Sequence, residues 1–177
     1  MRKTGFVIIF SILLASCQNT VLAPTPAAVP INAAFNPAEA AYIKAKGQGT
    51  IEGHAFLRQK TGGTINAAGE IVRLIPATNY ARERFAKLYG EAKFVPASAY
   101  PKAQTTDPRY GEFIRTTKAE STGRFVFDNV APGTYFISTQ VTWQKEGALF
   151  PEGGALYETV TLTGKETDPV KVIISGN

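Results

Sequence analysis

The sequence contains one cysteine, one histidine and one tryptophan among its 177 residues. A single cysteine cannot close an internal disulfide, so the fold depends on its hydrophobic core, and a chain of this length can bury about two thirds of its unfolded surface. The lone histidine, His54, leaves too few ligands for a zinc centre. The motifs HExxH, GxSxG and GxxxxGK[ST] are also missing, which removes the usual signals of metallopeptidases, serine hydrolases and phosphate-binding loops. We therefore predict no catalytic, cofactor-binding or metal-ligating residues and no enzymatic activity.

No uncharged apolar stretch reaches the length of about 20 residues that a membrane-spanning helix needs. The N-terminus instead has Arg2 and Lys3, then a short apolar run from Gly5 to Leu14, and then small residues. This order is typical of a secretory signal peptide, predicted here over residues 1–16.

The segment Leu14-Ala15-Ser16-Cys17 resembles the bacterial lipobox. The resemblance implies cleavage between Ser16 and Cys17 and acylation of Cys17, with a diacylglycerol on the sulfur. The alternative is an ordinary secretory signal that carries a cysteine by chance. Several acyl chains on one residue anchor a protein stably, so the mature chain is expected to be attached to a membrane rather than to span it.

Residue Gln18 follows the predicted lipidation site. In the Gram-negative lipoproteins that this region resembles, an aspartate there favours retention in the inner membrane, so Gln18 implies the periplasmic side of the outer membrane if the source is Gram-negative. Loss of Arg2 and Lys3 lowers the net charge of +5 to +3, too small an excess for a nucleic-acid binder. The expected partners are the membrane, through the lipid anchor, and another envelope protein.

Residues 17–35 are rich in alanine and proline and carry no charge. We interpret them as an extended tether, and the alternative is a segment packed on the domain. The following Asn36-Pro37-Ala38-Glu39 is typical of a helix start, with Asn36 as the cap and Glu39 reaching back to the cap amide. A short helix is predicted over residues 36–47, ending at Gly47.

Alternating apolar residues follow from residue 48 to residue 177. The alternation, with turn residues between the segments, predicts seven strands and an all-β sandwich. In the first strand, Gly53 and Ala55 are small residues on the buried face, which indicates a bulky neighbour there. The predicted strands are 49–58, 70–75, 112–118, 124–127, 134–143, 156–162 and 170–175.

The fourth and fifth of these strands carry the strongest pattern. Phe125 and Phe127 share one face, and the residues from Tyr135 to Trp143 repeat the same period. Between the two strands, Pro132 and Gly133 predict a tight type II turn.

Three segments together resemble the carboxypeptidase regulatory-like domain: Gly49-Thr-Ile-Glu-Gly53, Ile71-Val-Arg-Leu-Ile-Pro76 and the run from Gly123 to Ile137. The match covers about residues 48–175. It implies a seven-stranded Greek-key sandwich of the transthyretin-like (prealbumin-like) type. It implies no particular function, because unrelated proteins carry such domains, and one histidine provides nothing like the zinc peptidase site that the family name suggests.

The sequence departs from this family in an insertion, residues 77–111, between the second and third strands. Alternation gives way to helical spacing of Ala81, Phe85 and Leu88, which predicts a helix over residues 78–89, stopped by Gly90. Residues 94–111 contain three prolines and are predicted to form a long loop. We expect the insertion to be an appendage outside the core of the sandwich.

The region from Arg73 to Lys118 contains nine Lys or Arg residues and four Asp or Glu residues. Basic and aromatic groups together could hold an anionic polymer, lipid head groups or a protein partner, whereas the alternative is a solvated cover on the sandwich. The candidate binding surface consists of Tyr80, Arg82, Arg84, Lys87, Tyr89, Tyr100, Arg109 and Tyr110.

Two functions are consistent with these patterns. The first is a non-enzymatic, lipid-anchored envelope domain with a structural or protein-interaction role. The alternative is a glycan- or peptide-binding module that uses the insertion and the predicted loop at residues 151–154. A concave pocket lined by tyrosine or tryptophan would favour binding of a ligand, whereas an exposed edge strand or apolar patch would favour a protein partner.

Overall fold

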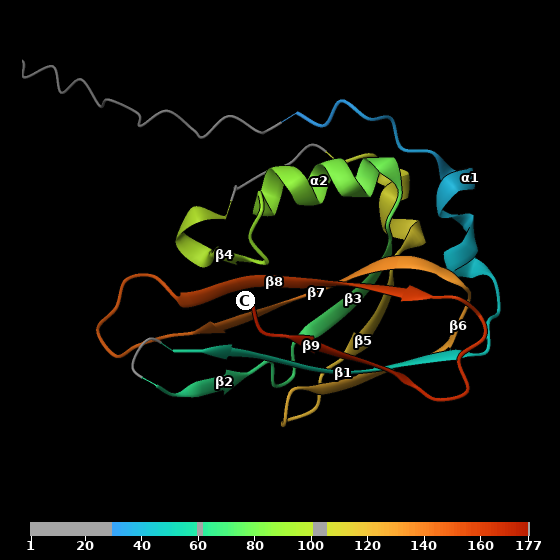
Figure 1. The fold of residues 1–177 in the computed structure, drawn as a ribbon. Coiled ribbons are helices and arrows are strands. Elements are labelled where there is room, and N and C mark those ends of the chain that lie inside the picture. Colours follow the sequence, from blue (N-terminus) through green and yellow to red (C-terminus); the bar gives the residue numbers. More distant parts are fainter. Residues whose placement is uncertain (1–29, 60–61, 101–105, 177) are drawn as a thin grey trace, which may run out of the picture.

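The computed structural model describes residues 30–59, 62–100 and 106–176. The predicted signal peptide, Cys17 and residues 17–29 of the predicted tether lie outside the described residues. Two β-sheets face each other as a sandwich (Figure 1). The four-stranded first sheet contains β1 (Gly49–Arg58), β2 (Thr64–Asn66), β6 (Arg124–Val130) and β9 (Val170–Ile174). The five-stranded second sheet has the order β4 (Phe94–Pro96), β8 (Glu152–Leu162), β7 (Gly133–Trp143), β3 (Ile71–Pro76) and β5 (Arg115–Lys118).

The predicted all-β sandwich is confirmed, and each predicted strand has a counterpart. Some boundaries differ: β6 continues to Val130, β8 begins at Glu152, and β5 begins only at Arg115 because the preceding residues form the 3-10 helix η3 (Pro108–Phe113). Two strands, β2 and β4, were not predicted. Each has only three residues and lies beside glycine or proline, so neither shows a measurable alternation.

The interior between the sheets is built from the predicted faces. Ile51, Ala55, Phe125 and Phe127 are buried on the first sheet. Tyr135, Ile137, Thr139 and Val141 are buried on the second. The expected bulky neighbour of the small residues in β1 is a phenylalanine, because a Cβ atom added to Gly53 would lie only 1.9 Å from the ring of Phe125.

The connection between β6 and β7 differs from the prediction. The two strands belong to different sheets, so Ala131 and Pro132 carry the chain across the sandwich. Gly133 has φ +153°, whereas the second central residue of a type II turn has φ of about +80°. The type II prediction was therefore wrong. The Tyr135 hydroxyl donates a hydrogen bond to the Ala131 carbonyl at 2.8 Å, which stabilises the connection between the two strands.

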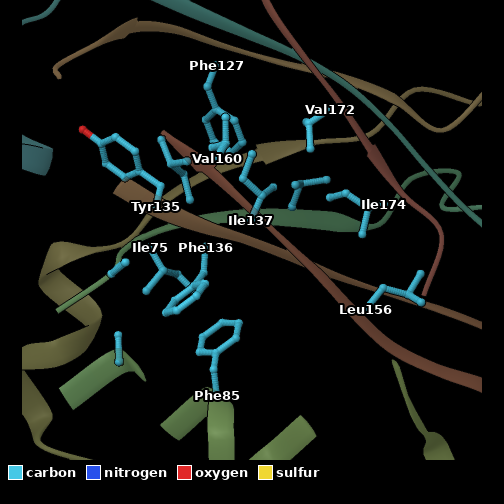
Figure 2. Packing of buried hydrophobic residues seen from close by; sticks show 14 of the residues in the cluster. Ile75, Phe85, Phe127, Tyr135, Phe136, Ile137, Leu156, Val160, Val172 and Ile174 are labelled. Atoms are coloured by element: carbon cyan, nitrogen blue, oxygen red, sulfur yellow. The ribbon is translucent and has the colours of Figure 1, made fainter. Parts of the chain in front are cut away.

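Helix α2 (Asn79–Tyr89) forms a further layer on the outer face of the second sheet (Figure 1). Its boundaries follow the prediction, since the Thr78 side chain accepts a hydrogen bond from the Ala81 amide and Gly90 ends the helix with φ +59°. The Phe85 ring stacks on Phe136 of β7 with 4.3 Å between ring centroids. Figure 2 shows Phe85 and Phe136 packed together on the opposite side of the sheet from Tyr135 and Ile137.

The insertion is therefore not an appendage outside the core. Its helix α2 covers Phe136. Its strand β4 pairs with β8 and adds an edge strand to the second sheet. The segment predicted as a long loop also holds the 3-10 helix η2 (Ala97–Ala99) and η3. The prediction failed because the alternation of β7 was assessed on one face, while Phe136 leaves an aromatic ring on the other face that must also be covered.

The N-terminal helix is shorter than predicted. It consists of α1 (Pro37–Ala40) and the 3-10 helix η1 (Ala41–Lys44) and ends before Gly47. The Asn36 side chain accepts from the Ala38 amide, as expected for a cap. Glu39 does not reach back to the cap amide but accepts at 2.8 Å from the amide of Asn79, at the start of α2.

Residues 30–35 lie on the domain and are not part of a free tether. The Glu83 carboxylate of α2 accepts hydrogen bonds from the amides of Asn32 at 2.9 Å and Ala33 at 2.6 Å. Phe35 is buried and packs edge-on against three aromatic rings, those of Tyr80, Tyr110 and Phe113. For this part of the predicted tether, the alternative of a packed segment is correct.

Candidate binding cleft

A cleft of about 450 Å³ lies where α2 and the chain around η3 meet the outer face of the second sheet. This volume is within the range of small-molecule sites. We call it the α2 cleft. The sheet contributes Arg73, Ile75, Ser138, Thr139, Gln140 and Ala155, the helix Arg84, Phe85, Leu88 and Tyr89, and the following chain Tyr100, Thr106, Tyr110, Gly111 and Ile114.

The sheet register brings the polar residues of the sheet into the cleft. Val72 and Leu74 of β3 are fully buried between the sheets, so the intervening Arg73 points to the outer face. Ser138 of β7 is the direct cross-strand neighbour of Arg73. Gln140 lies two residues further along β7, on the same face as Ser138. A cationic and two hydrogen-bonding side chains thus share one sheet surface.

Tyr89 and Tyr100 supply aromatic surface to the cleft. Tyr89 is buried against Phe85 and Tyr157, with ring centroids 5.5 Å and 4.4 Å away. Burial raises the pKa of Tyr89, the nearby Tyr100 adds to the rise, and the positive charge of Arg73 opposes it. Tyr100 has an exposed fraction of 47%, so part of its ring is open to a ligand.

Tyr110 carries a buried polar group that lacks a partner. Its hydroxyl oxygen is inaccessible to solvent and has no hydrogen bond within the described part of the chain. The Arg84 guanidinium lies 5.2 Å from the centre of the Tyr110 ring; its charge lowers the pKa, but its position gives no hydrogen bond of normal geometry to this oxygen. Burial has the larger effect and raises the pKa of Tyr110 to about 12. The hydroxyl therefore stays protonated at neutral pH and is able to donate.

The charged side chains that line the described part of the cleft are all positive. Its lining includes the guanidinium groups of Arg73 and Arg84, and no carboxylate is among the described residues that line it. Arg84 donates to the Thr106 hydroxyl at 3.1 Å, and its guanidinium lies over the rings of Tyr80 and Tyr110. These contacts hold the Arg84 side chain in place without neutralising its charge.

The candidate surface predicted from the sequence is divided by the fold. Arg84, Tyr89, Tyr100 and Tyr110 come together in the cleft. The other four predicted residues do not line it: Tyr80 is buried against Phe35, Arg82 lies over Phe136, Lys87 pairs with Glu83, and Arg109 pairs with Asp107.

Sequence reasoning missed Arg73, Ser138 and Gln140 as members of the site. The signal that could have found them is their position opposite the buried residues of β3 and β7, which places all three on one sheet face. The predicted loop at residues 151–154 also differs, because Glu152, Gly153 and Gly154 belong to β8.

Two other hollows of similar size have less suitable linings. One of about 440 Å³ lies beside Lys44, Lys46 and Arg115 and contains no aromatic side chain among its described residues. Another of about 460 Å³ lies against residues 30–35, and its arginine, Arg109, is already paired with Asp107 at 2.9 Å. The α2 cleft alone among these three combines several tyrosines with unpaired arginine charge.

The fold and the cleft define a class of protein: a β-sandwich with a helix packed on one sheet and a small-molecule-sized cleft beside that helix. No protein-family model and no curated protein matches the chain. The chain is similar to a protein of known crystal structure from Pseudomonas aeruginosa, named a "putative carbohydrate binding protein", with 31% identity and a TM-score of 0.66. The match covers 80% of this chain and 97% of that protein. The chain belongs to the same family as this Pseudomonas aeruginosa protein.

Proposed function

We propose that the chain is a non-enzymatic carbohydrate-binding module whose binding site is the α2 cleft. The observation that carries the proposal is the lining of the cleft, where tyrosine rings lie beside hydrogen-bonding groups on a rigid sheet. The name of the related Pseudomonas aeruginosa protein supports the same choice. Of the two functions predicted from the sequence, this is the alternative, ligand-binding one.

The chemistry of a sugar suits this lining. A pyranose ring has an apolar face of C–H groups, which packs on an aromatic ring, and a rim of hydroxyl groups, which need hydrogen-bonding partners. Tyr100 supplies an accessible aromatic face with a polar hydroxyl, and the largely buried Tyr89 ring adds to the lining. Ser138 and Gln140 supply donors and acceptors.

A binding assay with the full chain tests this proposal. We expect immobilised saccharides to retain the protein and Tyr100→Ala to weaken retention, since Tyr100 offers the most exposed ring of the cleft. Arg109→Gln is the matched control, because Arg109 is exposed and outside the cleft. Retention that is equal for both variants would contradict the assignment of the site, and retention by no saccharide would contradict the function.

The finer assignment of the fold is also a proposal. We propose that the sandwich is a Greek key of the transthyretin-like type found in carboxypeptidase regulatory-like domains. The crossing of the chain between sheets from β6 to β7 and the pairing of β1 with both β6 and β9 support it.

The cellular location that we propose rests on the N-terminal sequence. We propose a lipid anchor at Cys17 and a place in the cell envelope, on the periplasmic side of the outer membrane in a Gram-negative source. None of the helices in residues 30–59, 62–100 and 106–176 has the length and apolar character required to cross a membrane. A domain anchored in this way would meet envelope polysaccharides close to its own membrane.

A protein partner is the second candidate function, favoured by the tip of the β7–β8 hairpin. Leu149 and Phe150 have exposed fractions of 90% and 74%, and such apolar exposure is typical of contact surfaces. Replacing both with serine should abolish recovery of a specific envelope protein in a pull-down, while leaving saccharide binding unchanged. Recovery of the same proteins with and without the substitutions would contradict this second function.

A further inference from the structure

We infer that the ligand of the α2 cleft is an acidic saccharide, held through its anionic group by Arg73 and Arg84. The inference rests on the proposed carbohydrate-binding function and narrows it to sugars that carry a negative charge, of which a uronic acid is the simplest.

The charged side chains that line the cleft are arginines. Glu83 pairs with Lys87 at 2.6 Å and Asp107 with Arg109 at 2.9 Å. Glu70 accepts a hydrogen bond from Gln140 of the cleft at 3.4 Å but is not among the lining residues. A cleft with two guanidinium groups and no carboxylate among its described lining residues concentrates positive potential. A neutral sugar would leave that potential without a counter-charge.

Arg73 is available to bind an anion. It is exposed and has no ion pair or hydrogen bond with any residue that the structure describes. It extends from β3, which is paired on both sides by β5 and β7, so its backbone is fixed within the sheet. A guanidinium of this kind is suited to the bidentate binding of a carboxylate.

The side chain of Arg84 is held in place by its neighbours. Its guanidinium is positioned by the Thr106 hydroxyl at 3.1 Å and by the rings of Tyr80 and Tyr110 at 5.8 Å and 5.2 Å. The hydrogen bond to Thr106 uses one of the five guanidinium donors, and these contacts leave the charge unpaired. Because the side chain is already ordered, less conformational entropy is lost when a ligand binds.

Titration calorimetry of the full chain with matched sugar pairs tests the inference. Each pair consists of an acidic oligosaccharide and its neutral form: oligogalacturonate with its methyl ester, and hyaluronan fragments with their carboxyl-reduced forms. We expect the acidic member of at least one pair to bind about 10- to 100-fold more tightly, as hydrogen bonds to charged groups imply. Raising the salt concentration should reduce this preference.

Variants assign the preference to the two arginines. Arg73→Gln and Arg84→Gln should each remove about 10-fold of the affinity for the acidic sugar and leave that for the neutral sugar within about twofold. Arg82→Gln is the matched control, since Arg82 lies on the same helix but is exposed outside the cleft. Should a glutamine variant fail to fold by circular dichroism, the lysine variant keeps the charge but loses the bidentate geometry, and it should also lose part of the preference.

The outcomes separate the inference from the function on which it rests. Equal affinity for the members of every pair, or a preference that survives both glutamine variants, would overturn the acidic ligand while the carbohydrate-binding function stands. Binding of no sugar would overturn both. Tighter binding of an acidic peptide, such as oligoglutamate, would overturn the saccharide class.

Discussion

Phe125 and Val126 are neighbours in β6 whose side chains point to opposite faces of the first sheet. Phe125 is 3% exposed and lies against Gly53 of β1, whereas Val126 is 43% exposed. The Phe125 ring packs directly on the β1 backbone at Gly53. The cost of truncating each side chain should therefore differ strongly.

We expect Phe125→Ala to lower the free energy of unfolding by about 3–5 kcal/mol, the usual cost for a buried phenylalanine. Val126→Ala should cost well under half as much, because its side chain loses little buried area. Denaturant midpoints of the two variants provide the measurement. A larger loss for the valine variant would mean that the facing of β6 is reversed.

Single residues of the cleft show what local sequence patterns can and cannot reveal. Tyr89, Tyr100 and Tyr110 were predicted because tyrosines lie among the many basic residues between Arg73 and Lys118. Arg73 was not, because strand alternation gives the face of a side chain but not the element that covers that face. The covering of the outer sheet face by α2 depends on contacts far apart in the sequence.

At the scale of elements, residues 30–35 are fixed to α2 through one carboxylate. The backbone amide of Asn32 is the main cause that lowers the pKa of Glu83, followed by Lys87 and by the amide of Ala33, and the pKa falls to about 2. Because the folded-state pKa lies below the usual value of 4.5, ionised Glu83 stabilises the fold. This contribution is present above about pH 4.5 and is lost as the pH falls toward about 2.

We expect Glu83→Gln to flatten the loss of stability between about pH 4.5 and pH 2, because the variant has no carboxylate to protonate in this window. Thermal melting at a series of pH values, compared with the unaltered chain, checks this. The control is Glu146→Gln, since Glu146 is exposed and outside these contacts. Parallel pH profiles for the unaltered chain and Glu83→Gln would contradict the assigned role of the carboxylate.

Replacing residues 78–110 with a short Gly/Ser linker tests whether the insertion is integral. The replacement removes Phe85 and exposes Phe136, and the burial of each side chain contributes about 1.5–3 kcal/mol to the free energy of unfolding. It also removes β4 from the sheet. We expect the free energy of unfolding to fall by more than about 3 kcal/mol, which is a large part of the typical stability of a domain. Circular dichroism and thermal melting measure it, and an unchanged cooperative transition would show that the sandwich is self-sufficient.

Some helices and strands could be predicted from local sequence signals, whereas others depend on partners that are distant in the sequence. The boundaries of α2 were predictable because its cap residue, Thr78, and its terminating glycine, Gly90, are local signals. The strand β4 was not, because it exists through its pairing with β8, more than 50 residues away in the chain. The assignment of β6 and β7 to different sheets is likewise decided by their partners rather than by the intervening Pro132 and Gly133.

At the scale of the whole molecule, the proposed membrane location of the protein depends on Cys17. We expect Cys17→Ser to abolish acylation and to leave unprocessed precursor. Metabolic labelling with a fatty acid, followed by detergent fractionation, provides the measurement, with the unaltered chain as the control. Equal incorporation of label into both proteins would contradict the lipid anchor.

The pairing of β1 with β9 has a consequence for how the chain folds. β9 (Val170–Ile174) pairs in parallel with β1 (Gly49–Arg58), more than 100 residues away in the sequence. Contacts so distant in sequence slow folding. We therefore expect the first sheet to gain this strand late in folding, and removal of Val170–Ile174 should leave one side of β1 unpaired.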